Sequence, residues 1–280
     1  MRMKLREIVF MLAIAAVPVA AMAGDLPAPA ATASAPSPID GWLSQSYTVT
    51  VGAELRWMPR WVGADTYAPM PVPLFDIRRA GTPEKYCNAR DGIGVGLFEF
   101  GTLTIGPVMQ LEFARRVKSD PALTGTGDVK LGVLVGAFFE YWPVPWLRLR
   151  TETKEGIHGH HGFVADEIID FVVPIDRWTL SAGPRTTWAD ARANGRYFDI
   201  NAIQSAASGL PQWQAKAGTR SAGLGAQARY RLDQQWSSHV FVEYDRLIGD
   251  AADSPLVQQR GDPNQYTFGA GITYTFDIGR

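Results

Sequence analysis

The chain has 280 residues, a formal net charge of −1 at pH 7 and a single cysteine, Cys87. Its 27 basic and 28 acidic residues leave no basic excess, which argues against a nucleic-acid-binding protein. One cysteine allows no internal disulfide. After the N-terminus, no stretch is long and apolar enough for a transmembrane helix. We expect Cys87 to be a partly buried thiol.

The N-terminus has the three parts of a secretory signal peptide: a basic start, an apolar run too short to span a bilayer, and the small-x-small site Ala21-Met22-Ala23. We predict cleavage after Ala23 and export to the periplasm, the outer membrane or the medium. The sequence therefore predicts a signal peptide over 1–23, a flexible Ala/Pro/Ser-rich leader over 24–40, and one folded domain over 41–280.

Long segments of the folded domain alternate between apolar residues and small or polar ones. In Gln265–Phe276, the aromatic and aliphatic residues fall on one face, and Gln, Thr and Gly fall on the other. Strands of ten or more residues with aromatic residues at their ends are typical of a membrane-spanning antiparallel β-barrel with its apolar face toward lipid. The same pattern occurs in Tyr47–Trp57, Thr102–Phe113, Val129–Tyr141, Trp178–Trp188, Leu224–Leu232 and Trp236–Tyr244.

The connections alternate between short turns and long loops, as in outer-membrane barrels, whose long loops are extracellular. Val72–Ala89 decides the strand count. If it holds a hairpin of Pro73–Arg79 with Lys85–Ala89, the all-β barrel has twelve strands, and if it holds one strand, it has ten. We predict about twelve. One extracellular loop contains a predicted short helix that begins at the N-cap Asn201 and packs its apolar stripe on the barrel mouth.

The loop before the last strand, Leu247–Val257, resembles the signature of the MipA/OmpV family of outer-membrane proteins. The resemblance extends over nearly all of the predicted mature chain. It implies a non-enzymatic barrel in the cell outer membrane without a cofactor, similar to a scaffold that joins a lytic transglycosylase to a bifunctional murein synthase. Other members are linked to adhesion or stress response. The motif residues are Leu247, Gly249, Asp250, Ala251, Asp253, Ser254 and Pro255.

The last strand also resembles the terminal signal that the barrel-assembly machinery reads, through Gly271, Tyr274 and Phe276, although Asp277–Arg280 extend beyond it. We expect Asp250, Ser254 and Pro255 of the motif to build a turn by side-chain to backbone hydrogen bonds rather than to bind calcium.

Enzyme and metal-site alternatives have few candidate residues. Ser237 and His239 share a strand face with Glu243, and we interpret them as polar lining residues. His158, His160 and His161 are weak metal candidates because their glycine-rich loop offers no preorganised geometry.

A passive channel is the main rival. The charges expected to line the lumen have mixed signs and should pair across a narrow interior, which predicts an occluded barrel. They are Glu54, Arg56, Glu112, Lys130, Glu140, Arg148, Arg150, Arg185, Arg229, Arg231 and Glu243.

Overall fold

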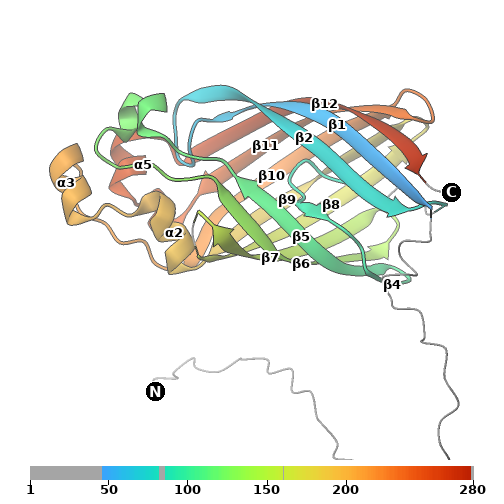
Figure 1. Cartoon of the computed structure of the whole chain (residues 1–280), viewed down its shortest axis with the longest axis horizontal. Coiled ribbons are helices and arrows are strands. Elements are labelled where there is room, and N and C mark those ends of the chain that lie inside the picture. The colour runs from blue at the N-terminus through green and yellow to red at the C-terminus, as the bar shows by residue number, and fades with distance from the viewer. Residues whose placement is uncertain (1–45, 82–85, 160, 279–280) are drawn as a thin grey trace, which may run out of the picture. The chain divides into compact units, whose positions relative to one another are not determined.

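Twelve strands form one antiparallel sheet that curls into a nearly closed barrel (Figure 1). The computed structural model describes residues 46–81, 86–159 and 161–278, so the predicted signal peptide and leader lie outside the described residues. Ten strands are long and two are short. They are β1 (Tyr47–Pro59), β2 (Tyr67–Arg79), β3 (Ile93–Gly94), β4 (Phe98–Phe100), β5 (Leu103–Glu112), β6 (Gly132–Val144), β7 (Leu147–His158), β8 (Phe163–Ile175), β9 (Trp178–Ala189), β10 (Gly218–Arg231), β11 (Trp236–Leu247) and β12 (Asn264–Ile278).

The two ends of the described chain meet in the wall. Strand β1 pairs with β12 from Tyr47 opposite Ile278 to Trp57 opposite Phe268. Both terminal strands therefore have their free ends at the same end of the barrel, together with the short turns between later strands. We call this the turn end, and the opposite one, which carries the long loops, the loop end.

Side chains are distributed as a membrane barrel requires. Apolar residues on the outer face are exposed, such as Leu55 at 57% and Phe268 at 49%, while charged residues on the inner face are buried, such as Arg148 at 0%. A soluble sandwich would bury its apolar face and expose its charges. The apolar exterior and polar interior identify an outer-membrane-type barrel. None of the helices among the described residues is long and apolar enough to cross a membrane.

Aromatic side chains pair across neighbouring strands near both ends of the wall. At the turn end, the ring centroids of Trp236 and Tyr274 are 4.8 Å apart, and at the loop end, those of Tyr244 and Tyr266 are 5.1 Å apart. These pairs occupy the positions at which aromatic girdles meet the two membrane interfaces.

The strand count of twelve is confirmed, but the predicted hairpin is wrong in its second half. Residues 86–89 form no strand and lie inside the barrel, while the extra strands are β3 and β4, both paired to β5. Turn-forming and charged residues in this stretch find their partners in the polar interior rather than in a lipid-facing wall. The predicted alternation of short and long connections also has an exception at the loop end, where β7 continues to His158 and β8 begins at Phe163, so the loop between them is short.

Strands β2 and β3 are the two ends of the sheet order, so the wall has a seam between them. Strand β2 carries Pro69, Pro71 and Pro73, alternate residues that lack a backbone N–H. Proline tolerates a strand only where its missing donor faces an unpaired edge. The three prolines explain why β2 ends the sheet.

The loop end is covered by a cap of short helices with a core of its own. The helices are η1 (Val117–Ser119), η2 (Pro121–Leu123), α2 (Ala191–Phe198), α3 (Ala202–Ser208), α4 (Gly249–Ala252) and α5 (Pro255–Arg260). The capping box of Asn201 and Gln204 is present as predicted. The core of the cap contains Trp61, Ala64, Leu123, Val129, Tyr197, Phe198, Ile200, Leu210, Ala215, Leu247, Ala251, Leu256 and Val257.

The predicted docking of the α3 stripe on the barrel mouth is wrong. The predicted stripe consists of Ile203, Ala206, Ala207 and Leu210. Ile203 is 80% exposed, both alanines are exposed, and only Leu210, which follows the helix, is buried. Helix α3 instead lies against Gly125, where an added Cβ would be 2.6 Å from the Ala207 carbonyl carbon. The backbone of the helix makes this contact, which leaves the stripe facing outward.

Candidate functional site

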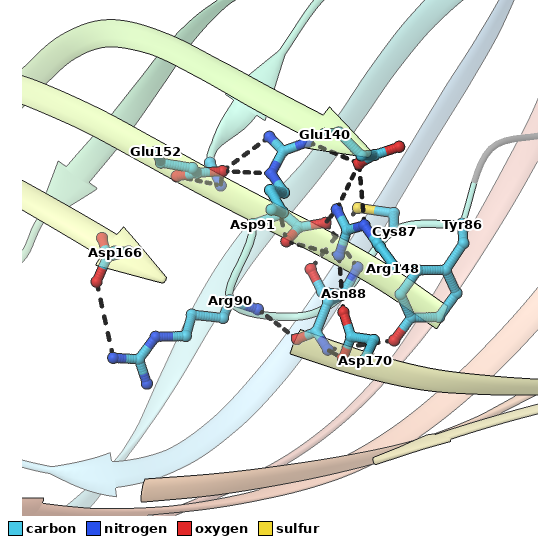
Figure 2. A network of polar contacts seen from close by, with 12 residues as sticks. Tyr86, Cys87, Asn88, Arg90, Asp91, Glu140, Arg148, Glu152, Asp166 and Asp170 are labelled. Atoms are coloured by element: carbon cyan, nitrogen blue, oxygen red, sulfur yellow. Dashed lines mark hydrogen bonds and ion pairs between the residues drawn. The ribbon is translucent and has the colours of Figure 1, made fainter. Parts of the chain in front are cut away.

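A seven-residue segment, Tyr86–Gly92, leaves the wall after β2 and crosses the barrel interior (Figure 2). We call it the inner segment. Its local sequence favours a turn: the Asp91 N–H donates to the Asn88 carbonyl at 3.1 Å, and the Asn88 N–H donates to Asp91 Oδ2 at 2.9 Å. Asn88 Oδ1 accepts from the Arg90 N–H at 3.0 Å. Asn and Asp commonly stabilise such turns through side-chain to backbone bonds.

Side chains of the wall satisfy the backbone of the inner segment. Gln227 on β10 accepts from the Ala89 N–H at 3.0 Å and donates to the Cys87 carbonyl at 2.9 Å. Arg56 on β1 donates to the Ala89 carbonyl at 2.7 Å, and Glu152 on β7 accepts from the Gly92 N–H at 3.0 Å. Because buried backbone groups need partners, these bonds hold an irregular segment stably inside the lumen.

The strongest attachment is an ion-pair cluster around Arg148 on β7 (Figure 2). Its guanidinium lies 2.6 Å from Asp91, 2.8 Å from Glu140 and 2.9 Å from Asp170. No side chain of this cluster is more than 5% exposed. Buried charges are stable only when paired and hydrogen-bonded, and three carboxylates surround this one guanidinium.

Polar contacts reach the remaining parts of the wall. Arg90 donates to Asp245 on β11 at 2.6 Å and to Thr187 on β9 at 2.7 Å. Asn88 donates to Asp170 on β8 at 3.0 Å. The inner segment therefore bonds to strands on several sides of the lumen. It extends across the interior and is not part of the wall.

The network continues from the inner segment toward the loop end. Arg150 pairs with Glu152 at 2.7 Å, and Lys154 pairs with Glu152 at 2.7 Å and with Asp166 at 2.8 Å. Strands β7 and β8 place these charges on their inner faces at every second residue. Together with the inner segment, they form a network of paired charges in the interior.

Most residues predicted to line the lumen do so. Glu54, Glu140, Arg148, Arg150 and Arg185 are buried, while Arg56, Glu112, Arg229 and Glu243 are partly buried. The prediction that Lys130 and Arg231 line the lumen is wrong. Both are exposed, because Lys130 precedes β6 and Arg231 is the last residue of β10.

Sequence reasoning missed Tyr86–Gly92 as an internal element. It predicted the inward Arg148 and Arg150 of β7 but missed Glu152 and Lys154 on the same strand and Asp166 and Asp170 on β8. The alternation of Arg148, Arg150, Glu152 and Lys154 is the signal that could have identified β7 as a charged wall strand. Cys87 is exposed rather than partly buried.

Among the described residues, the histidines considered as catalytic or metal-binding residues lie apart from the ion-pair cluster around Arg148. His239 lies with Nε2 2.5 Å from Glu54 Oε2 across the β11–β12–β1 wall, and Ser237 is buried on the same strand. His158 and His161 are exposed, and His160 lies outside the described residues. Within the described ranges, no group of three His, Cys, Asp or Glu side chains is arranged to hold a metal ion.

The signature loop builds the cap. Leu247 and Ala251 are buried in the cap core, and Gly249 has φ +56°, a conformation that favours glycine. Asp250 accepts from the Lys216 N–H at 2.7 Å, and Ser254 donates to the Phe198 carbonyl at 2.8 Å. Pro255 begins α5, and Asp253 is exposed.

The last strand carries the residues that resemble an assembly signal. Gly271 faces the lumen, where an added Cβ would lie 2.5 Å from the His239 ring. Tyr274 packs against Trp236, and its ring centroid is 5.8 Å from that of Phe276. Gly271 is thus required to admit the His239 ring that pairs with Glu54.

Comparisons with solved structures find outer-membrane barrels at low identity. The NanC porin is 10% identical with a TM-score of 0.40, and the match covers 81% of this chain and 98% of that one. An outer membrane channel from Pseudomonas putida F1 is 10% identical with a TM-score of 0.42, over 83% and 96%. OmpT of Vibrio cholerae is 10% identical with a TM-score of 0.34, over 82% and 97%. No curated protein matches the chain.

A comparison with protein families gives the more specific result. The model described as MltA-interacting protein MipA matches residues 51–276, which extend from β1 to β12 and include the inner segment, the cap and the signature loop. The chain therefore belongs to the MipA family.

Proposed function

We propose that this protein is a non-enzymatic scaffold of the outer membrane, exported by a signal peptide cleaved after Ala23. In this proposal, the turn end faces the periplasm and holds murein-hydrolysing and murein-synthesising enzymes near the membrane. The partners are a lytic transglycosylase and a bifunctional murein synthase. The family description, which names an MltA-interacting protein, supports the first of them.

The observation that carries the proposal is the ion-pair cluster inside the lumen. Arg148 and its carboxylates are buried there and hold the inner segment across the interior, which supports an occluded barrel. A barrel whose interior is closed by buried ion pairs acts through its ends rather than through a pore. The apolar outer wall anchors it in lipid.

Site-specific crosslinking in cells tests the scaffold directly. A photo-crosslinkable amino acid replaces the exposed turn residues Asp176 and Gln234 in separate variants, and Ile203 in the cap is the matched control. We expect murein enzymes to be captured from the two turn positions and not from Ile203. Capture of other partners from Ile203 alone would instead support an adhesin that works through its extracellular loops.

A conductance measurement tests the closed barrel separately. Planar bilayers containing the purified protein should show no large, steady conductance. Such a conductance would overturn the closed barrel and favour the channel alternative, whatever the crosslinking shows.

A further inference from the structure

Three arginines converge at the loop end around Tyr197, outside the ion-pair network of the lumen. Arg115 donates to the Tyr197 carbonyl at 2.7 Å, and Arg220 on β10 has Cζ 5.7 Å from the centre of the Tyr197 ring. Arg196 precedes Tyr197 in α2 and is close enough to Arg115 to act on its ionisation. A loop, a helix and a strand thus bring three guanidinium groups to one place.

Negative charge at this cluster is sparse. Among the described residues, Glu112 contacts it directly: one oxygen accepts from the Tyr197 hydroxyl at 2.8 Å, and the other lies 3.8 Å from Arg220 Nη1. Asp128 also acts on the charge of Arg115, so the three arginines face two carboxylates. In the lumen, by contrast, Arg148 alone has three carboxylates within 2.9 Å. The cluster therefore holds more positive than negative charge.

Each of the three arginines also has a buried nitrogen without a hydrogen-bond partner in the described structure: Nε of Arg115, Nε of Arg196 and Nη2 of Arg220. Arg115 and Arg220 are only 4% and 7% exposed. A buried N–H of a charged group without an acceptor is costly, and native proteins rarely leave several together. Burial lowers the pKa of Arg115 to about 10, and the neighbouring Arg196 acts in the same direction.

We propose that Arg115, Arg196 and Arg220 form a binding site for a phosphate group at the loop end of the barrel. A tetrahedral oxyanion offers several acceptors to guanidinium forks and adds the negative charge that the cluster lacks. Arg196 is only partly buried and marks the side from which an anion enters. The phosphate comes either from free inorganic phosphate or from the headgroup of an outer-leaflet lipid.

Binding to the purified full-length protein in detergent tests the site. Titration calorimetry compares inorganic phosphate with chloride at matched ionic strength, and a second arm uses detergent-solubilised lipid A. We expect saturable binding in at least one phosphate arm, weakened at least tenfold by Arg220→Gln and by Arg196→Gln. Binding in the first arm identifies free phosphate, and binding only in the second identifies the lipid.

Arg246→Gln is the matched control, since Arg246 is an exposed arginine near the same end of the barrel. It should leave binding unchanged. Because Arg220 is buried, its variant is checked for folding by heat-dependent electrophoretic mobility. Arg196→Gln, at a partly buried position, keeps the test valid if Arg220→Gln fails to fold. The site is refuted if neither phosphate source binds better than chloride, or if Arg246→Gln reduces binding as much as Arg196→Gln.

Discussion

Arg148 on β7 and Asp91 of the inner segment form an ion pair of 2.6 Å, and neither side chain is more than 3% exposed. This pair joins the element that closes the barrel to the wall that surrounds it.

Removing Asp91 should destabilise the folded barrel. Asp91→Ala takes one of three carboxylates from Arg148 and removes the carboxylate 3.7 Å from Arg150, so two buried guanidinium groups lose a shared partner. We expect the free energy of unfolding to fall by about 3–5 kcal/mol. Denaturant titration in detergent micelles measures the change.

Asp176→Asn provides the control for Asp91→Ala. Asp176 is an exposed turn residue with φ +54°, a conformation that Asn also tolerates. Its free energy of unfolding should change by less than about 0.5 kcal/mol. A loss as small as this for Asp91→Ala would show that the inner segment is not held by its ion pairs.

Replacing Tyr86–Gly92 by a Gly/Ser stretch of equal length should open the barrel to ions. The replacement removes Arg90 and Asp91 together and leaves more acidic than basic groups on the wall, so the new conductance should favour cations. Single-channel recording with asymmetric salt checks both points. A variant that remains closed would assign the occlusion to the wall charges alone. The basic wall residues named above are Arg56, Arg148, Arg150, Lys154, Arg185, Arg220 and Arg229, and the acidic ones are Glu54, Glu112, Glu140, Glu152, Asp166, Asp170, Glu243 and Asp245.

The cap should loosen in acid through Asp120. Burial alone would raise the pKa of Asp120, but hydrogen bonds from Thr66, from the Ala122 N–H and from the Trp61 indole outweigh it and lower the pKa below its usual value. Since the folded pKa is lower than the unfolded one, this stabilisation is complete above about pH 4 and is lost as the pH falls through the folded pKa.

Trp61 fluorescence and limited proteolysis between pH 2 and pH 6 follow this transition of the cap. Asp120→Asn should weaken the cap at neutral pH and remove the part of the pH dependence that Asp120 causes. An unchanged acid transition in Asp120→Asn would assign it to other carboxylates.

The signature loop should act mainly through packing. Leu256 is fully buried in the cap core, so Leu256→Ala should lower the stability of the cap by about 2–5 kcal/mol. Gln258→Ala, at an exposed position on the same helix, should change it by less than about 0.5 kcal/mol. The rate of proteolysis within the cap reports both. Equal rates for the two variants would mean that the loop serves recognition rather than structure.

The wall of the barrel was predictable because its pattern is local. In β12, alternate residues from Tyr266 to Ile272 face outward as their sequence indicates, and β1 and β9 begin at the predicted residues. The inner segment was not predictable in this way. Its turn chemistry is visible in Asn88 and Asp91, but its partners come from strands that are distant in the sequence, by 33 residues for Arg56 with Ala89 and by 82 for Asn88 with Asp170, and no periodicity encodes them.

The arginine cluster could not be predicted from the sequence for the same reason. Arg115, Arg196 and Arg220 lie in three unrelated stretches, and only the folding of the cap onto the barrel mouth brings them together. Helix α2 was missed because it has eight residues and few apolar ones, although its N-cap Asp190 accepts from the Ala193 N–H at 2.8 Å.

The prolines of β2 bear on how the barrel carries mechanical load. Since Pro69, Pro71 and Pro73 leave β2 without a paired outer neighbour, no ladder of backbone bonds joins β2 to β3 among the described residues. The circumference can therefore widen along this line while every strand pairing elsewhere stays intact. The inner segment leaves the wall beside the same line and bonds to strands on several sides of the lumen, so it limits how far the circumference of the barrel can widen.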